Sequence, residues 1–176
     1  DQQDVPLVFV GYGISAPERH WDDYKDLDLS GKIAVVLIND ADFEAEQPGA
    51  FDGKAVTYYG RWTYKFEEAA RQGAAAALTT HDVPAPGYGC DGVQNRWPGA
   101  QFDLPASADP EPRLPLQGWI TGETAAQLFT DAGLDLEALR AAANKPGFKP
   151  VAIGDATFDA SLTSTVTEAS SRNILA

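Results

Sequence analysis

The sequence has one cysteine and two histidines among its 176 residues. Cys90 on its own excludes an internal disulfide and any zinc cluster built from cysteines. A catalytic zinc site needs about three protein ligands, and neither His20 nor His81 belongs to an HExxH pair of the kind that commonly contributes to one. The chain has no run of about 18 apolar residues, so no transmembrane helix is predicted. We therefore expect no metal or other cofactor within this chain and no insertion into a membrane.

Basic residues are also scarce, since 13 Lys plus Arg stand against 26 Asp plus Glu and give a net charge of -13. Such a surface repels nucleic-acid phosphates and anionic lipid headgroups, so neither is an expected partner. What the chain does have is 44% hydrophobic and 22% charged residues. This composition and length predict one globular domain with a core of its own.

Both ends of the sequence indicate an excised piece of a longer protein. The opening DQQDVPLVFV has neither the basic start nor the apolar core of a signal peptide, so an export signal would lie upstream of it. The ending SSRNILA stops inside an apolar run. We expect residues 1–5 and 169–176 to be junctions to a further domain.

The first half of the chain predicts a strand, a crossover helix and a second strand. Residues 7–10 and 33–38 are short β-branched apolar runs, which are typical of strands buried on both faces. Residues 63–73 place apolar or small side chains at helical spacing, with Thr63 as the expected N-cap, Glu67 and Glu68 in the first turn, and Gly73 at the end. Residues 74–80 form the next predicted strand.

The second half begins with a long irregular segment, residues 83–118, which holds more than half of the 12 prolines. Loops of this length usually bind, cover or contact something. A strand at 116–120 follows, then a helix capped by Thr121 and ended by Gly133, and a shorter helix capped by Asp135. Alternating apolar and polar residues from Phe158 to Thr167 predict a long, half-exposed final strand.

Three short patterns look catalytic, and each has a structural interpretation that we favour. Glu67-Glu68 is expected to complement the dipole of its helix, with Glu67 paired to Arg71. His81-Asp82 ends a strand, where adjacent side chains point to opposite faces. Ser15 lies in G-x-S-x-P, which lacks the second glycine of a nucleophile elbow, and Gly11 and Gly13 are expected to form a tight turn.

One group of side chains suits recognition rather than catalysis. Tyr, Trp and Arg are the residue types that anchor interfaces and line ligand clefts. Such residues either fasten the long loop to the core or form a contact surface for a neighbouring domain or a peptide. The candidates are Tyr58, Tyr59, Arg61, Trp62 and Tyr64, with Asn95 and Trp97 in the long loop.

Four segments in order resemble the protease-associated domain inserted in zinc-dependent aminopeptidases, in the family related to glutamate carboxypeptidase and the transferrin receptor. They are LVFVGYGISAPERHWDDYKDLDLSGKIAVVLIND, AVTYYGRWTYKFEEAARQGAAAALTTHD, VQNRWPGAQFDL and GWITGETAAQLF. The resemblance runs from about Val5 to Ala176, so residues 1–176 would be a single protease-associated domain. It implies an α+β (mixed α/β) fold, with a β-barrel-like or sandwich core flanked by two to three helices.

The resemblance also implies a role without catalysis. Two zinc ions would be held by a peptidase domain that this chain does not include, and no catalytic residue carries over onto this sequence. The domain would border the active-site cleft and govern the access of peptide substrates, or make protein contacts. Its own peptidase domain and peptide substrates would be its partners, in a periplasmic or secreted protein. The alternative is a stand-alone module that binds peptides or glycans through the aromatic residues.

Overall fold

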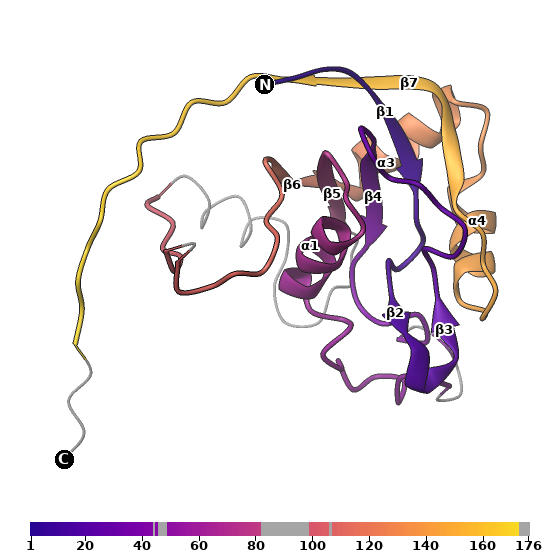
Figure 1. Cartoon of the computed structure of the whole chain (residues 1–176). Helices are drawn as coiled ribbons and strands as arrows, with labels where there is room; N and C mark the ends of the chain where they lie inside the picture. The colour runs from indigo at the N-terminus through magenta and orange to yellow at the C-terminus, as the bar shows by residue number, and fades with distance from the viewer. Residues whose placement is uncertain (44, 46–48, 82–98, 106, 173–176) are drawn as a thin grey trace.

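The computed structural model describes residues 1–43, 45, 49–81, 99–105 and 107–172. Figure 1 shows a central sheet with helices packed against it and an extended segment that leaves the sheet after the last strand. The elements are β1 (Gln2–Phe9), β2 (Ser15–Ala16), the 3-10 helix η1 (Pro17–Arg19), β3 (Trp21–Asp22), β4 (Ile33–Leu37), α1 (Trp62–Arg71), β5 (Ala76–His81), β6 (Gln117–Thr121), α3 (Gly122–Asp131), α4 (Leu136–Ala143) and β7 (Val151–Ala160). None of the helices described is long and apolar enough to cross a membrane.

The main sheet has the strand order β6-β5-β4-β1-β7. Strands β6, β5, β4 and β1 run parallel to one another, and the edge strand β7 pairs with β1 in the antiparallel sense. The mixed α/β class and the strand, helix, strand crossover are therefore confirmed. The expected barrel-like or sandwich core differs from what is seen, because the described strands form one open sheet of five and a short β2–β3 pair. The inner strands β4 and β5 are buried on both faces, which suits a sheet covered by helices on each side.

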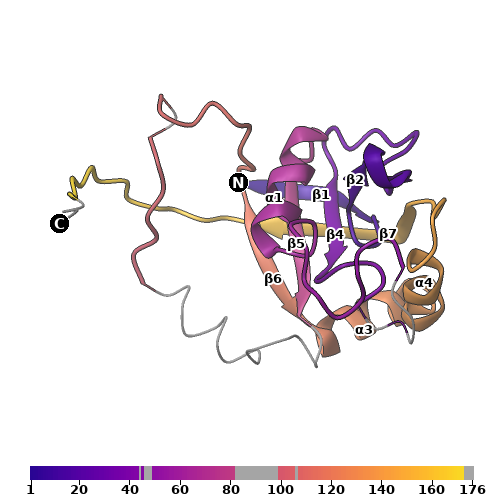
Figure 2. The same ribbon diagram turned by 90° about the horizontal axis from the view of Figure 1, so that it is seen from below.

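Helices cover the two faces of this sheet (Figures 1 and 2), with α1 on one face and α3 and α4 on the other. Successive residues of a strand point to opposite faces, so each inner strand contributes to two separate apolar clusters. Val8 and Val36 pack in the cluster that contains Phe66 of α1. Phe9 packs in the other cluster, where its ring centroid lies 5.2 Å from that of Phe129 in α3.

Local signals correctly predicted the two later helices. The Thr121 side chain accepts a hydrogen bond from the Thr124 amide, and Asp135 accepts one from the Ala138 amide, so both are N-caps. Gly133 adopts a φ of +71° after α3, the left-handed conformation that a glycine permits at a helix end.

The predicted start of α1 was wrong. Its N-cap is Arg61 rather than Thr63, so Glu67 and Glu68 lie beyond the first turn. Arg71 also pairs with Glu68, at 2.9 Å between Nε and Oε2, rather than with Glu67. A preceding turn, in which the Gly60 and Arg61 amides donate to the Thr57 and Tyr58 carbonyls, brings the chain into the helix early. Asp40 holds Thr57 at the start of this turn, so a contact distant in sequence overrides the capping preference of threonine.

The final strand begins earlier and ends earlier than predicted. Strand β7 stops at Ala160, the residue that pairs with Gln2 at the start of β1. Residues 161–172 then have no neighbouring strand and no regular structure. Leu162 and Val166 continue the apolar alternation but are 71% and 89% exposed. The sequence after Ala160 alternates as a strand does, but none of the described strands pairs with it.

The turn after β1 confirms the expected role of its glycines. Gly11 and Gly13 both have a φ of +59°. A Cβ on Gly13 would lie 2.7 Å from the Tyr24 hydroxyl oxygen and 2.9 Å from Cγ1 of Val36. The turn therefore needs glycine for its conformation and also for the space that its neighbours occupy.

We predict that Gly13→Ala lowers the free energy of unfolding by about 3 kcal/mol, the sum of left-handed strain and overpacking. Gly31→Ala is the matched control, because Gly31 has a φ of +67° and a Cβ added there would meet no neighbouring group within 4 Å. That control should lose only about 1 to 2 kcal/mol, from strain alone. Urea unfolding measures both, and equal losses would show that the contacts around Gly13 relax freely.

Candidate functional site

Three tyrosines of the predicted cluster gather at the start of α1 and in the turn before it. The ring centroids of Tyr58 and Tyr59 are 5.8 Å apart, and each lies 5.1 Å from the centroid of Tyr64. All three pairs are edge-to-face, the arrangement that aromatic quadrupoles favour. Tyr64 is buried and Tyr58 is 52% exposed, so the group extends from the core to the surface.

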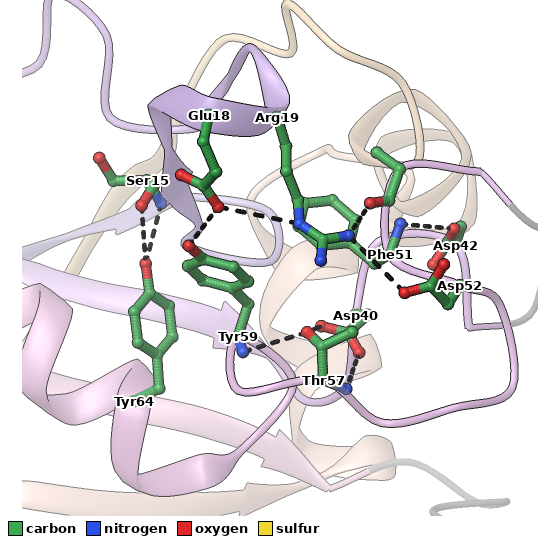
Figure 3. Close-up of polar contacts among 11 residues, drawn as sticks. Ser15, Glu18, Arg19, Asp40, Asp42, Phe51, Asp52, Thr57, Tyr59 and Tyr64 are labelled. Atoms are coloured by element: carbon green, nitrogen blue, oxygen red, sulfur yellow. Dashed lines mark hydrogen bonds and ion pairs between the residues drawn. The ribbon is translucent and has the colours of Figure 1, made fainter.

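One further ring and one cation lie beside Tyr59, as Figure 3 shows for Phe51 and Arg19. Phe51 lies 5.8 Å from Tyr59 and 5.1 Å from Trp21, measured between ring centroids. The Arg19 guanidinium stands over the Phe51 ring at 5.3 Å, donates to the Ala50 carbonyl, and lies 3.9 Å from an oxygen of Asp52. Arg19 thus joins helix η1 to the segment from residue 49 to residue 59.

The three tyrosine hydroxyls each have a defined partner. Tyr59 donates to Glu18 at 2.6 Å, and Tyr58 donates to Glu67 at 3.1 Å. The Tyr64 hydroxyl accepts from the Ser15 amide at 3.0 Å and lies 3.3 Å from its carbonyl oxygen, so it fastens α1 to β2. The hydrogen bond from Tyr59 holds the pKa of Glu18 below its ordinary value, and the same bond raises the pKa of Tyr59.

Trp62 lies with a different set of rings. Its centroid is 6.1 Å from that of Phe66 and 6.4 Å from that of Trp119 on β6, and Trp119 in turn lies 5.7 Å from His81. Trp62 is 38% exposed. His81 is the last residue of β5, as predicted for a strand end, and is buried. One continuous stretch of sequence therefore supplies two neighbouring aromatic groups.

The remaining predicted residues have separate outcomes. Arg61 is exposed. It is the N-cap of α1, and its carbonyl accepts a hydrogen bond from the Lys65 amide. Asn95 and Trp97 lie outside the described residues. We call Tyr58, Tyr59, Arg61, Trp62 and Tyr64 together the aromatic surface, of which Tyr58, Arg61 and Trp62 are the exposed members.

Two aspartates that the sequence patterns did not single out hold the segment beneath this surface. Asp40 accepts from the Thr57 amide at 2.7 Å and from its hydroxyl at 2.8 Å. Asp42 accepts from the Gly49 amide at 2.7 Å and from the Phe51 amide at 2.9 Å. Both aspartates follow the carboxyl end of β4. A pair of acidic residues soon after a buried strand was therefore the sequence signal that could have identified them.

A buried lysine links α1 to the rest of the domain. Lys65 is inaccessible to solvent, and its Nζ donates to the Tyr12 carbonyl at 2.6 Å. The ammonium lies 5.9 Å from the ring centroids of both Tyr12 and Tyr64. Its counter-charges are Asp40 and Asp23. An ammonium in this position connects the turn after β1 with the helix that displays the aromatic surface.

Burial dominates the ionisation of this cluster. It lowers the pKa of Lys65 to about 7, although Asp40 and Asp23 act in the opposite direction. It raises the pKa of Asp23 to about 7, against the hydrogen bonds that this carboxyl accepts from the Ile14 amide and the Trp21 indole. The pKa of Asp40 is raised as well, again chiefly by burial. Desolvation disfavours the charged form of each group.

This arrangement offers a firmly held aromatic contact surface. Tyr and Trp present large apolar faces at a small entropic cost, and their hydroxyls or indole nitrogens add directional hydrogen bonds. Within the described parts of the chain, the histidine and acidic side chains form no group of three or more that could hold a metal ion.

Comparisons with protein-family models, curated proteins and solved structures find no match to this chain. The resemblance to protease-associated domains therefore stays a prediction from the sequence segments that carry it. Among the described residues, the aromatic surface is the feature whose geometry best suits recognition of another molecule.

The depressed pKa of Lys65 predicts how stability changes with pH. Because the folded-state pKa of about 7 lies below the ordinary value of 10.5, the burial cost is fully present below pH 7 and is relieved as pH rises toward 10.5. Relative to Lys65→Met, the natural chain should thus gain stability as pH rises from about 7 toward 10.5. Urea unfolding at several pH values measures this difference.

The exposed Lys25→Met is the matched control and should show no such pH-dependent difference. A constant difference between the natural chain and Lys65→Met over the same range would mean that the ammonium stays charged in the folded protein.

Proposed function

We propose that this chain is a non-catalytic protease-associated domain of a periplasmic or secreted zinc aminopeptidase. The two zinc ions and the catalytic groups would belong to a peptidase domain in the same polypeptide. The role of this domain would be to border the active-site entrance and govern which peptides reach it. The observation that carries the proposal is the aromatic surface, where exposed Tyr58, Arg61 and Trp62 stand on a buried polar and aromatic frame.

The frame matters because a contact surface gains affinity when its side chains are ordered before binding. Tyr58 is held through its hydroxyl by Glu67 and through its ring by Tyr59 and Tyr64. Trp62 is held by Phe66 and Trp119. A peptide passing over these rings would meet apolar faces that keep one orientation. Selection by size and shape requires such rigidity, whereas mobile side chains would adapt to any sequence.

Replacing the exposed members tests the role in substrate access. In the natural full-length polypeptide, Tyr58→Ala, Arg61→Ala and Trp62→Ala should each raise KM for peptide substrates about 5-fold to 30-fold, the range of about 1 to 2 kcal/mol per contact. Under this proposal, aminoacyl chromogenic substrates would be too short to reach the surface, so their kcat/KM should change little. Lys149→Ala, an exposed cation after α4, is the control.

Unchanged peptide kinetics in all three variants would restrict the aromatic surface to a structural role. Absence of zinc-dependent aminopeptidase activity from the full-length polypeptide would refute the proposal itself. In that case, direct binding of peptides or glycans by the natural chain, weakened by Tyr58→Ala, would support the stand-alone module.

A further inference from the structure

Arg19 places its guanidinium on one ring of the tyrosine cluster, the name we give to Tyr58, Tyr59 and Tyr64. The guanidinium lies 6.0 Å from the ring centroid of Tyr59. Its Nε lies 3.8 Å from an oxygen of Glu18, the same oxygen to which the Tyr59 hydroxyl donates. Figure 3 shows these three side chains together. A tyrosine, a carboxylate and a guanidinium thus form one unit on this side of the cluster.

Arg71 forms a similar unit with a second ring. Its guanidinium lies 5.8 Å from the ring centroid of Tyr64, and its Nε lies 2.9 Å from an oxygen of Glu68. A guanidinium held between an aromatic ring and a carboxylate combines a cation–π attraction with an ion pair. The tyrosine cluster therefore accommodates this chemical group twice within the chain itself.

Tyr58 and Glu67 form a third tyrosine–carboxylate pair, and this one faces solvent. The Tyr58 hydroxyl donates to Glu67 Oε2 at 3.1 Å, and Tyr58 is 52% exposed. Arg71 acts on the hydroxyl of Tyr58. Within the described part of the chain, however, no basic side chain stands over the Tyr58 ring or forms an ion pair with Glu67.

The charges around this pair favour a cationic ligand. The charge of Arg71 is met by two carboxylates, Glu68 at 2.9 Å and Glu111 at 3.4 Å. Glu67 therefore adds a further negative charge to a chain whose net charge is -13, and such a field attracts cations. Arg61 is the exposed cation of the aromatic surface, but it precedes Glu67 by six residues, which is about 9 Å along a helix axis.

We propose that Tyr58 and Glu67 form a subsite for the guanidinium of an arginine side chain in a bound peptide. The planar guanidinium stacks on the exposed ring and donates to Glu67. The hydrogen bond from Tyr58 to Glu67 moves electron density into the ring, which strengthens the attraction of its face for a cation. Contacts with Tyr59 and Tyr64 order the ring before binding. The inference rests on the proposed function, which supplies the peptide.

Peptide binding by the 176-residue chain tests the subsite without relying on activity. The probes are N-acetyl-Gly-Arg-Gly-amide and the same peptide with citrulline, which has the shape of arginine but no charge. Both ends of each peptide are blocked, so the side chain carries the only difference in charge. Calorimetric titration should give the arginine peptide a dissociation constant about 3-fold to 30-fold lower, the combined effect of one exposed cation–π contact and one surface ion pair.

Two variants and a matched control locate the preference for arginine. Glu67→Gln removes the charge but keeps an oxygen that can accept from Tyr58, and Tyr58→Leu removes the ring, so each should remove most of the preference. Glu123→Gln should keep it, because Glu123 is an exposed carboxylate in the first turn of α3, on the other face of the sheet (Figure 1). Thermal unfolding of each variant checks that the fold is retained.

Equal binding of the two peptides by the natural chain would overturn the subsite. Loss of the preference in Glu123→Gln as well would overturn it in favour of a general attraction of cations to an acidic surface. A preference that depends on Tyr58 and Glu67, in a protein whose full-length form lacks zinc aminopeptidase activity, would support the subsite and refute only the proposed function. Zinc aminopeptidase activity together with equal binding would refute only the subsite.

Discussion

The buried ammonium of Lys65 is the interaction on which the arrangement around α1 depends. It reaches from the helix to the Tyr12 carbonyl in the turn after β1, with Asp40 and Asp23 as its counter-charges. A buried charge is tolerated only when partners surround it, so these elements must keep their positions together. Asp40 in turn holds Thr57, the residue from which the turn into α1 begins. The exposed rings are thereby tied to an electrostatic contact in the core.

This dependence explains why stability and surface geometry are coupled here. The segment after β1 is fastened to the tyrosines by Glu18 and Arg19, which contact Tyr59, and by Ser15, which bonds to Tyr64. Asp42 fastens the segment after β4 to Phe51. Most of these ties join parts of the chain that are distant in sequence. A change in the segment from residue 15 to residue 19 would therefore be felt at Tyr59, which bonds to Glu18 across a separation of 41 residues.

Much of the fold could be predicted because its signals are local. The apolar run of β4 and the caps Thr121 and Asp135 specify their elements within a few residues. The errors arose where distant partners decide. Strand β7 ends at Ala160 because β1 provides no partner beyond Gln2, and α1 begins at Trp62 because a tertiary turn delivers it there. The aromatic surface was predictable from residue types, but Lys65 was not, since a lone lysine beside an apolar helix face usually points to solvent.

The pairing of Gln2 with Ala160 also has a mechanical meaning. Strands β1 and β7 run antiparallel, so the outer ends of the two strands lie side by side at one end of the ladder. A force pulling these ends apart would load the hydrogen bonds one after another rather than all at once. The ladder would open like a zipper under a small load, whereas the parallel contacts of β4 with β1 and β5 would bear none of it until β7 had peeled away.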